Sequence, residues 1–129
     1  MKLKSSKEQI PYKQRPWIGV DLDGTLAYYQ SGDGVDSIGA PIPKMKDRVV
    51  KWVLAGERVK IMTARACQQP YKDELVAQIK EWLKLHFPVY CHDIEVTNEK
   101  DFLMKVLYDD RAVQVLANTG DIVGGEHLR

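Results

Sequence analysis

Ten residues near the start of the chain, 17–26, constrain its fold more than any other stretch. They read WIGVDLDGTL, an apolar run that ends in two aspartates, Asp21 and Asp23, with a glycine directly after them. A short apolar run bounded by a turn signal is typical of a buried strand. Asp21 would then lie at the carboxyl end of that strand, where open α/β sheets bind their ligands. Two carboxylates this close repel each other unless a proton or cation lies between them. The stretch therefore predicts a hard divalent metal and phosphate chemistry.

The size and composition of the chain fit a single globular domain. With 129 residues, 44% of them hydrophobic, the chain can build a core without disulfide bonds. No apolar run reaches the roughly 18 residues of a membrane span, and a net charge of +1 indicates no particular partner. Cys67, Cys91 and His92 lack the paired spacing of a zinc site. Two cysteines make no disulfide framework, so we expect a cytoplasmic protein without membrane contact.

The order of the expected elements predicts an α/β fold. Apolar residues that recur every three to four positions indicate helices over 44–55 and 71–86. After the first strand, further strands are expected at 58–63, 94–97, 106–108 and 113–116. Strands that alternate with helices favour βα units and a mainly parallel sheet.

The segments outside these elements set the domain limits. Residues 1–15 form a basic arm that we expect to be flexible and solvated rather than bound to nucleic acid. A single domain is expected over 16–123, followed by a tail at 124–129. Residues 30–43 are rich in Gly, Ser, Asp and Pro, which indicates a loop too short to fold as a separate cap over the site.

Polar residues follow the predicted strands where each of them ends. Thr63 follows the second strand, and Asp109 and Asp110 follow the fourth, with Lys100 a few residues before it. Right-handed crossovers bring the carboxyl ends of parallel strands to one edge of the sheet, which would also hold the two aspartates of the first strand. If the fourth strand continues through Asp109, Asp110 points to the opposite face, which favours Asp109 as the direct metal ligand.

These segments resemble the four motifs of the haloacid dehalogenase (HAD) superfamily of phosphotransferases, in the same order. They are Asp21-Leu22-Asp23-Gly24-Thr25, Ile61-Met62-Thr63, Lys100 and Leu107-Tyr108-Asp109-Asp110. The likeness covers about residues 16–118 and implies a Rossmann-like three-layer α/β/α sandwich without a large cap domain. Within the superfamily, 23–27, Thr63-Ala64-Arg65 and Asp109-Asp110-Arg111 look like the 3′-phosphatase domain of phage-type polynucleotide kinases. The chain also resembles small HAD-type proteins of phages and bacteria.

The resemblance implies a mechanism. Asp21 would attack phosphorus and form an aspartyl-phosphate, and Asp23 would act as general acid and then general base. The implied cofactor is Mg²⁺, held by Asp21, the backbone carbonyl of Asp23 and Asp109. Asp110 would bind the metal directly or hold a metal-bound water.

The resemblance also implies a set of groups around the phosphate. Thr63, Lys100 and the backbone amides of Leu22 and Ala64 would hold the phosphoryl oxygens. Arg65 and Arg111 would contact substrate or pair with an active-site acid.

The expected activity is Mg²⁺-dependent hydrolysis of a phosphorylated substrate, with a nucleotide or nucleic-acid 3′-phosphate favoured. Two alternatives stay open. One is a phosphotransferase or mutase of the same fold, and the other is a non-catalytic binding protein with a vestigial phosphatase site. The sequence leaves the oligomeric state open.

Overall fold

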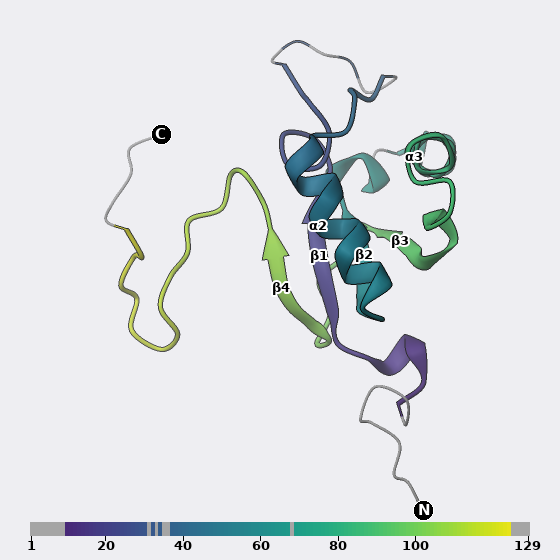
Figure 1. Cartoon of the computed structure of the whole chain (residues 1–129). Coiled ribbons are helices and arrows are strands. Elements are labelled where there is room, and N and C mark those ends of the chain that lie inside the picture. Colours follow the sequence, from purple (N-terminus) through teal and green to yellow (C-terminus); the bar gives the residue numbers. More distant parts are fainter. Residues whose placement is uncertain (1–9, 31, 33, 35–36, 68, 125–129) are drawn as a thin grey trace, which may run out of the picture.

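The computed structural model of the chain describes residues 10–30, 32, 34, 37–67 and 69–124 (Figure 1). Four strands and two α-helices make up the body. In chain order they are β1 (Trp17–Asp21), α2 (Pro43–Leu54), β2 (Arg58–Met62), α3 (Lys72–His86), β3 (Ile94–Thr97) and β4 (Met104–Tyr108). The predicted helices and the first four predicted strands are confirmed to within two residues at nearly every end.

The four strands form one parallel sheet in the order β3-β2-β1-β4. β1 lies inside the sheet, with Asp21 level with Met62 of β2 and Val20 level with Tyr108 of β4. The prediction of an α/β fold with a parallel sheet is thus confirmed. All four strands end at the same edge, because parallel strands share one direction.

Both helices have the end signals and apolar stripe expected from the sequence. Pro43 opens α2, where the fixed φ of proline suits a first helical position. Gly56 follows its end with φ +81°, a left-handed conformation that glycine adopts without steric cost. α3 carries Asp73 and Glu74 in its first turn and Lys84 in its last, which complements the helix dipole.

One continuous core lies between the helices and one face of the sheet. Alternate strand residues point into it, among them Ile18, Val20, Val59 and Ile61. Met45 and Val49 of α2 and Ile79, Trp82 and Leu83 of α3 belong to the same buried cluster. Both helices therefore pack on a single face, so the described residues form two layers. The third layer of the predicted sandwich is not confirmed.

The opposite face of the sheet is crossed by the short connection between β3 and β4. Asp101 in this connection accepts a hydrogen bond of 2.7 Å from the Trp17 indole and lies 3.5 Å from the Lys60 ammonium. That ammonium also lies 4.5 Å from the centre of the Trp17 ring. Gly19 makes room for the ring, since an added Cβ would lie 3.0 Å from it. Trp17 is fully buried as a result.

The chain ends differ from the sequence expectation in two places, the segment 113–116 and residues 10–15 of the arm expected to be flexible. Residues 113–116, expected as a fifth strand, do not join the sheet, and only Val115 makes an isolated bridge, to Ile122. At the other end, Arg58 is buried and donates hydrogen bonds to the carbonyls of Lys13 and Arg15, which ties 10–15 to the sheet. The rest of the predicted arm, 1–9, and most of the predicted tail, 125–129, lie outside the described residues. Among the helices that the structure describes, none has the length and apolar character to cross a bilayer.

Candidate active site

The carboxyl edge of the sheet brings three chain segments together. β1 ends in Asp21, β2 is followed by Thr63, and β4 is followed by Asp109 and Asp110. β1 lies between β2 and β4, so Asp21 occupies the middle of this edge. The strand ends that were predicted to meet at one edge of the sheet therefore do so in the structure.

Three carboxylates form an acid cluster at this edge: Asp21, Asp109 and Asp110. One ligand oxygen from each lies within 4.8 Å of the others. The Thr25 hydroxyl lies 3.2 Å from an Asp110 oxygen and 3.5 Å from an Asp21 oxygen. Asp21 and Asp109 are half-buried and Asp110 is exposed. Carboxylate oxygens in this number and proximity are a donor set suited to a hard divalent cation.

The condition under which Asp110 would point away from the acid cluster is not met. It required β4 to continue through Asp109, but β4 ends at Tyr108. The Asp109 carboxylate then accepts a 2.7 Å hydrogen bond from the Arg111 backbone N–H, which turns the chain. Because strand alternation no longer applies beyond Tyr108, both acids reach Asp21.

The environment of Asp21 disfavours its charged form. Burial, a hydrogen bond with Asp110 and the negative charges of the neighbouring acids together raise the pKa of Asp21 to about 7, and burial has the largest effect. Desolvation and like charges both favour a bound proton in place of a bare carboxylate. A cation in the cluster would remove the same penalty.

The raised pKa of Asp21 predicts a pH-dependent stability in the absence of divalent cations. The proton bound to folded Asp21 stabilises the protein fully below the ordinary pKa, 3.8, and this contribution is lost as pH rises through about 7. Between about pH 5 and pH 8 in a chelator, we expect urea unfolding to show a loss of about 1–2 kcal/mol, allowing for solvent screening. Asp21→Asn should lack this loss. For the wild-type protein, adding Mg²⁺ at about pH 8 should restore the lost free energy of unfolding. A wild-type pH profile that matches that of Asp21→Asn would contradict the prediction.

The second aspartate of the motif, Asp23, is held apart from the acid cluster by Arg65. The guanidinium donates two hydrogen bonds to its carboxylate, of 2.7 and 2.9 Å, and a third of 2.7 Å to the Ser37 carbonyl. Arg65 is buried, whereas the Asp23 side chain keeps 24% of its exposure. Two parallel bonds fix both the position and the plane of the carboxylate. Arg65 therefore pairs with Asp23, an acid of the predicted motif, and its predicted contact with substrate stays a prediction.

The loop that follows Asp23 is closed at its base. The Tyr28 N–H donates to the Ala40 carbonyl, and the Ile42 N–H donates to the Leu26 carbonyl. With the Arg65 bond to the Ser37 carbonyl, the described ends of the loop are held beside the acids.

Two cavities of about 540 Å³ each lie between α3 and β3. They are separate from the candidate site, since Asp21, Asp23, Asp109 and Asp110 do not line them.

The remaining predicted residues take different positions. Thr63 is buried, and its hydroxyl accepts a hydrogen bond from the Arg65 backbone N–H. Leu22 is buried in the core next to Asp21, and Ala64 opens a short 3₁₀ turn, Ala64–Cys67. Lys100 and Arg111 are exposed, and neither side chain forms an ion pair with another residue in the described part of the chain. The predicted contacts of these groups with phosphate stay predictions.

The sequence reasoning missed the contribution of Gly24, which makes room for the acid cluster. A Cβ at this position would lie 2.5 Å from a carboxylate oxygen of Asp110 and 2.9 Å from its carboxyl carbon, and φ is +88°. The contact of Thr25 with two of the acids was also missed. Their place in the motif Asp21-Leu22-Asp23-Gly24-Thr25 was the sequence feature that could have indicated both contacts.

Gly24→Ala should weaken Mg²⁺ binding, because the new methyl group would push Asp110 out of the cluster. Gly56→Ala is a matched control, since Gly56 has a similar φ of +81° but an added Cβ would meet nothing within 4 Å. Both variants should lose about 1 kcal/mol of stability from the left-handed backbone. Only Gly24→Ala should show about tenfold weaker Mg²⁺ affinity in a calorimetric titration. Equal affinities in the two variants would contradict this role of Gly24.

Comparison with known proteins adds nothing to this geometry. No protein-family model matches the chain, and no match was found among curated proteins or solved structures.

Proposed function

We propose that the chain is a Mg²⁺-dependent phosphomonoester hydrolase of the HAD type, without a large cap domain. The observation that carries the proposal is the acid cluster, with Asp23 held beside it by Arg65. A nucleophile, a second acid in a fixed position and a cation site are what phosphoryl transfer to a carboxylate requires. The order of the strands and the parallel sheet support the fold assignment, and its third layer stays a prediction.

The chemistry of the acid cluster fits a magnesium ion. Asp21, Asp109 and Asp110 offer only oxygen atoms, the ligands that Mg²⁺ prefers, and the backbone carbonyl of Asp23 would complete the protein ligands. The raised pKa of Asp21 reports the crowding that such an ion relieves. When bound, Mg²⁺ supplies positive charge that offsets the phosphate oxygens and the carboxylates.

Asp21 would act as the nucleophile. One of its oxygens forms a bond to phosphorus while the bond from phosphorus to the ester oxygen breaks, which gives an aspartyl-phosphate. Asp23 would donate a proton to the departing oxygen. In the second step Asp23 would take a proton from the water that attacks the phosphorus, which releases phosphate and regenerates Asp21.

The remaining predicted residues would hold the transferring group. The Thr63 hydroxyl and the Lys100 ammonium would bind phosphoryl oxygens, together with the backbone amides of Leu22 and Ala64. Arg65 is engaged with Asp23, so we assign it to positioning that acid. Arg111 remains available for substrate.

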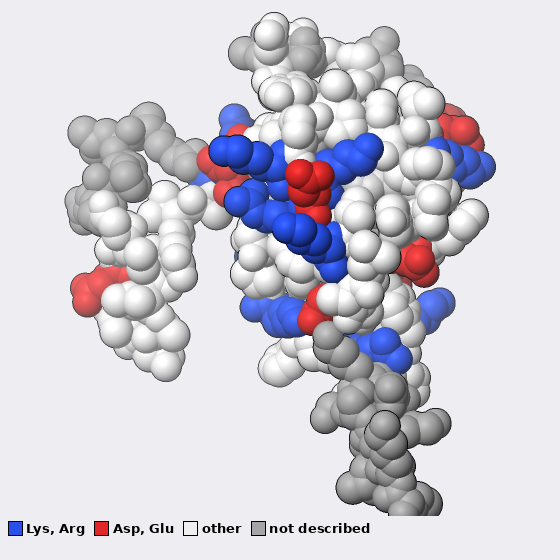
Figure 2. Space-filling model, viewed as in Figure 1, with Lys and Arg blue, Asp and Glu red and all other residues white. Residues whose placement is uncertain are grey.

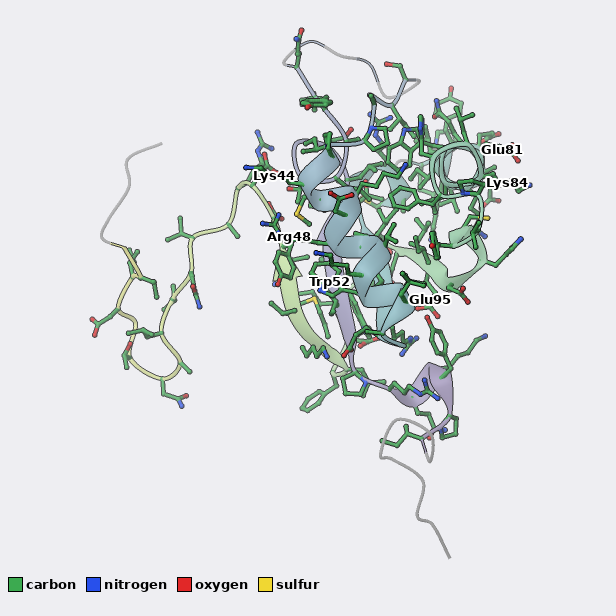
Figure 3. All side chains as sticks on the ribbon, in the orientation of Figure 1. Lys44, Arg48, Trp52, Glu81, Lys84 and Glu95 are labelled. Atoms are coloured by element: carbon green, nitrogen blue, oxygen red, sulfur yellow. The ribbon has the colours of Figure 1, made fainter. Side chains whose placement is uncertain are left out.

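A nucleotide or nucleic-acid 3′-phosphate is the substrate we favour. Lys44, Arg48 and Lys51 are exposed on α2 and lie on one face by helical spacing, and Figure 2 shows Lys and Arg side chains gathered on the face of the molecule that carries α2. Lys44 lies in the first turn of α2, directly after the loop that leads from Asp23, and Arg48 lies one turn further along the helix (Figure 3). A polyanion whose end enters the site would meet this positive surface.

The test is a panel of phosphoesters with Mg²⁺: a 3′-phosphorylated oligonucleotide, a mononucleotide and a sugar phosphate. Release of inorganic phosphate with the oligonucleotide preferred would support both the activity and the substrate class. Equal, weak turnover of all three would reject the nucleic-acid substrate. Transfer of phosphate to an added acceptor instead of water would identify a phosphotransferase. No turnover of any ester would reject the hydrolase and favour the non-catalytic binding protein with a vestigial phosphatase site.

A further inference from the structure

We propose that the C-terminal arm, residues 112–124, docks against β4 of a second copy of this chain, so that two copies exchange arms. The arm follows Arg111 and stands apart from the body (Figure 1). Every residue in it is exposed except Ile122, which is partly buried. The proposal concerns assembly and is independent of the proposed activity.

The arm is already shaped as a small hairpin. Val115 and Ile122 form an antiparallel bridge, with backbone hydrogen bonds of 2.8 Å from Leu116 to Asp121 and 2.9 Å from Val123 to Gln114. Asn118 and Gly120, with φ of 64° and 79°, make the turn between the two sides. A two-stranded hairpin is at best marginally stable alone in water, so this one needs a surface to pack on.

The side chains of the arm suit an apolar surface. Four of them keep large exposed fractions: Val113 at 39%, Val115 at 52%, Leu116 at 50% and Val123 at 41%. Asp121 is the only charged residue in 112–124, and the arm is nearly uncharged in Figure 2. Apolar side chains gathered on one projecting segment are typical of an interaction site.

β4 provides a complementary surface. Within the described residues it pairs with β1 alone, so its outer edge has backbone groups without a strand partner. Val106 and Tyr108 on this strand are 41% and 38% exposed. An open strand edge with apolar side chains readily accepts another strand. Each copy thus carries one hairpin that needs cover and one edge that can provide it.

Reciprocal exchange satisfies both surfaces with a twofold axis, the usual symmetry of small assemblies. The turn at Asp109 starts the arm in a direction away from its own β4, which favours the β4 of another copy. Fully extended, a 13-residue segment would expose roughly 1,800 Å², which is an upper bound for the hairpin, so covering one side of it removes at most about 900 Å². This is close to the about 800 Å² that each partner contributes to a standard interface.

Molar mass measured by light scattering tests the proposal. The full chain has a mass of 14.7 kDa, so at about 100 µM we expect about twice that value. The double variant Val115→Asp, Leu116→Asp should have the mass of one chain, because charge on the arm opposes its burial. Leu85→Asp is the control, since Leu85 is an equally apolar and 73% exposed residue on α3, and it should keep the wild-type mass. A wild-type mass of one chain, or a double variant that still dimerises, would overturn the proposal.

Amide hydrogen exchange identifies the surface on which the arm docks. For wild-type protein, amides of the arm and of the outer edge of β4 should be protected at about 100 µM and lose that protection together on dilution to the single-chain mass, whereas the β4 amides bonded to β1 should stay protected. Arm protection that does not depend on concentration would show docking on its own chain and would overturn the exchange. Both readouts are unaffected by whether the protein hydrolyses phosphoesters.

Discussion

Asp21→Asn is expected to lower kcat for Mg²⁺-dependent phosphoester hydrolysis by about 10⁴-fold or more. The substitution keeps the shape of the side chain but replaces the attacking carboxylate with a neutral amide, which cannot form the aspartyl-phosphate. It also removes one charge from the acid cluster, so Mg²⁺ binding should weaken as well. The measurement is steady-state phosphate release at saturating substrate and high Mg²⁺.

The same variant should be folded and, without Mg²⁺ at about pH 8, at least as stable as the wild-type protein. The ionised form of Asp21 is disfavoured by burial and by neighbouring acids, and an amide does not have this cost. A loss of activity together with an unchanged or higher free energy of unfolding would exclude misfolding as the cause. Asp47→Asn on the exposed face of α2 is the control and should keep the wild-type kcat. Full activity in Asp21→Asn would reject Asp21 as the nucleophile.

Arg65→Ala should have the second-largest effect, on both stability and activity. It removes the two hydrogen bonds to Asp23 and the one to the Ser37 carbonyl, and leaves the Asp23 carboxylate without this cation, in a site from which water is partly excluded. Breaking such a pair by removing one partner costs about 3–5 kcal/mol, and we expect the lower end because Asp23 is partly exposed. Asp23 would lose its fixed orientation, so kcat should fall by about 100-fold, the low end for a general acid.

Arg58→Ala separates the two effects of the Arg65 substitution. Arg58 is buried to the same extent and pairs with Glu95 at 3.1 Å, but it lies at the opposite end of β2 from the acids. Both variants should be destabilised, whereas kcat per folded molecule should fall only in Arg65→Ala. Arg65→Lys should keep the charge but not the two parallel bonds, and its kcat should lie between those of Arg65→Ala and the wild type. If Arg58→Ala and Arg65→Ala reduced kcat equally, Arg65 would have a structural role only.

Local sequence patterns were sufficient to predict most of the fold. The apolar runs before Asp21 and Thr63 became β1 and β2, and Pro43 and Gly56 lie at the ends of α2. The segment 113–116 has the same alternation as a strand but no neighbour in the sheet. Alternation indicates which side chains share a face, yet it cannot show whether a partner strand is present. This is why the fifth strand was predicted and is not found.

Some features of the candidate site were likewise predictable from the sequence, and others were not. The residue types and their place at strand ends predicted that Asp21 and Asp109 meet. The position of Asp110 depends on where β4 stops, and strand ends are the least certain part of any reading of a sequence. The resemblance named Arg65 as a residue that pairs with an active-site acid or contacts substrate, but left both roles and the choice of acid open. The pair with Asp23, 42 residues away in the sequence, is seen only in the structure.

The position of β1 in the sheet determines the order in which the acids would come apart. Asp21 follows a strand that is supported on both sides, whereas Asp109 and Asp110 follow a strand with one neighbour. Local opening begins where supporting contacts are fewest, so in a single chain the β4 side should detach while β1 is still in place. Asp21, the proposed nucleophile, then belongs to the part of the molecule that opens last, whereas Asp109 and Asp110 belong to a part that opens and closes earlier. A cation bound by acids from both sides would link them, so its first effect should be a lower rate of local opening at β4.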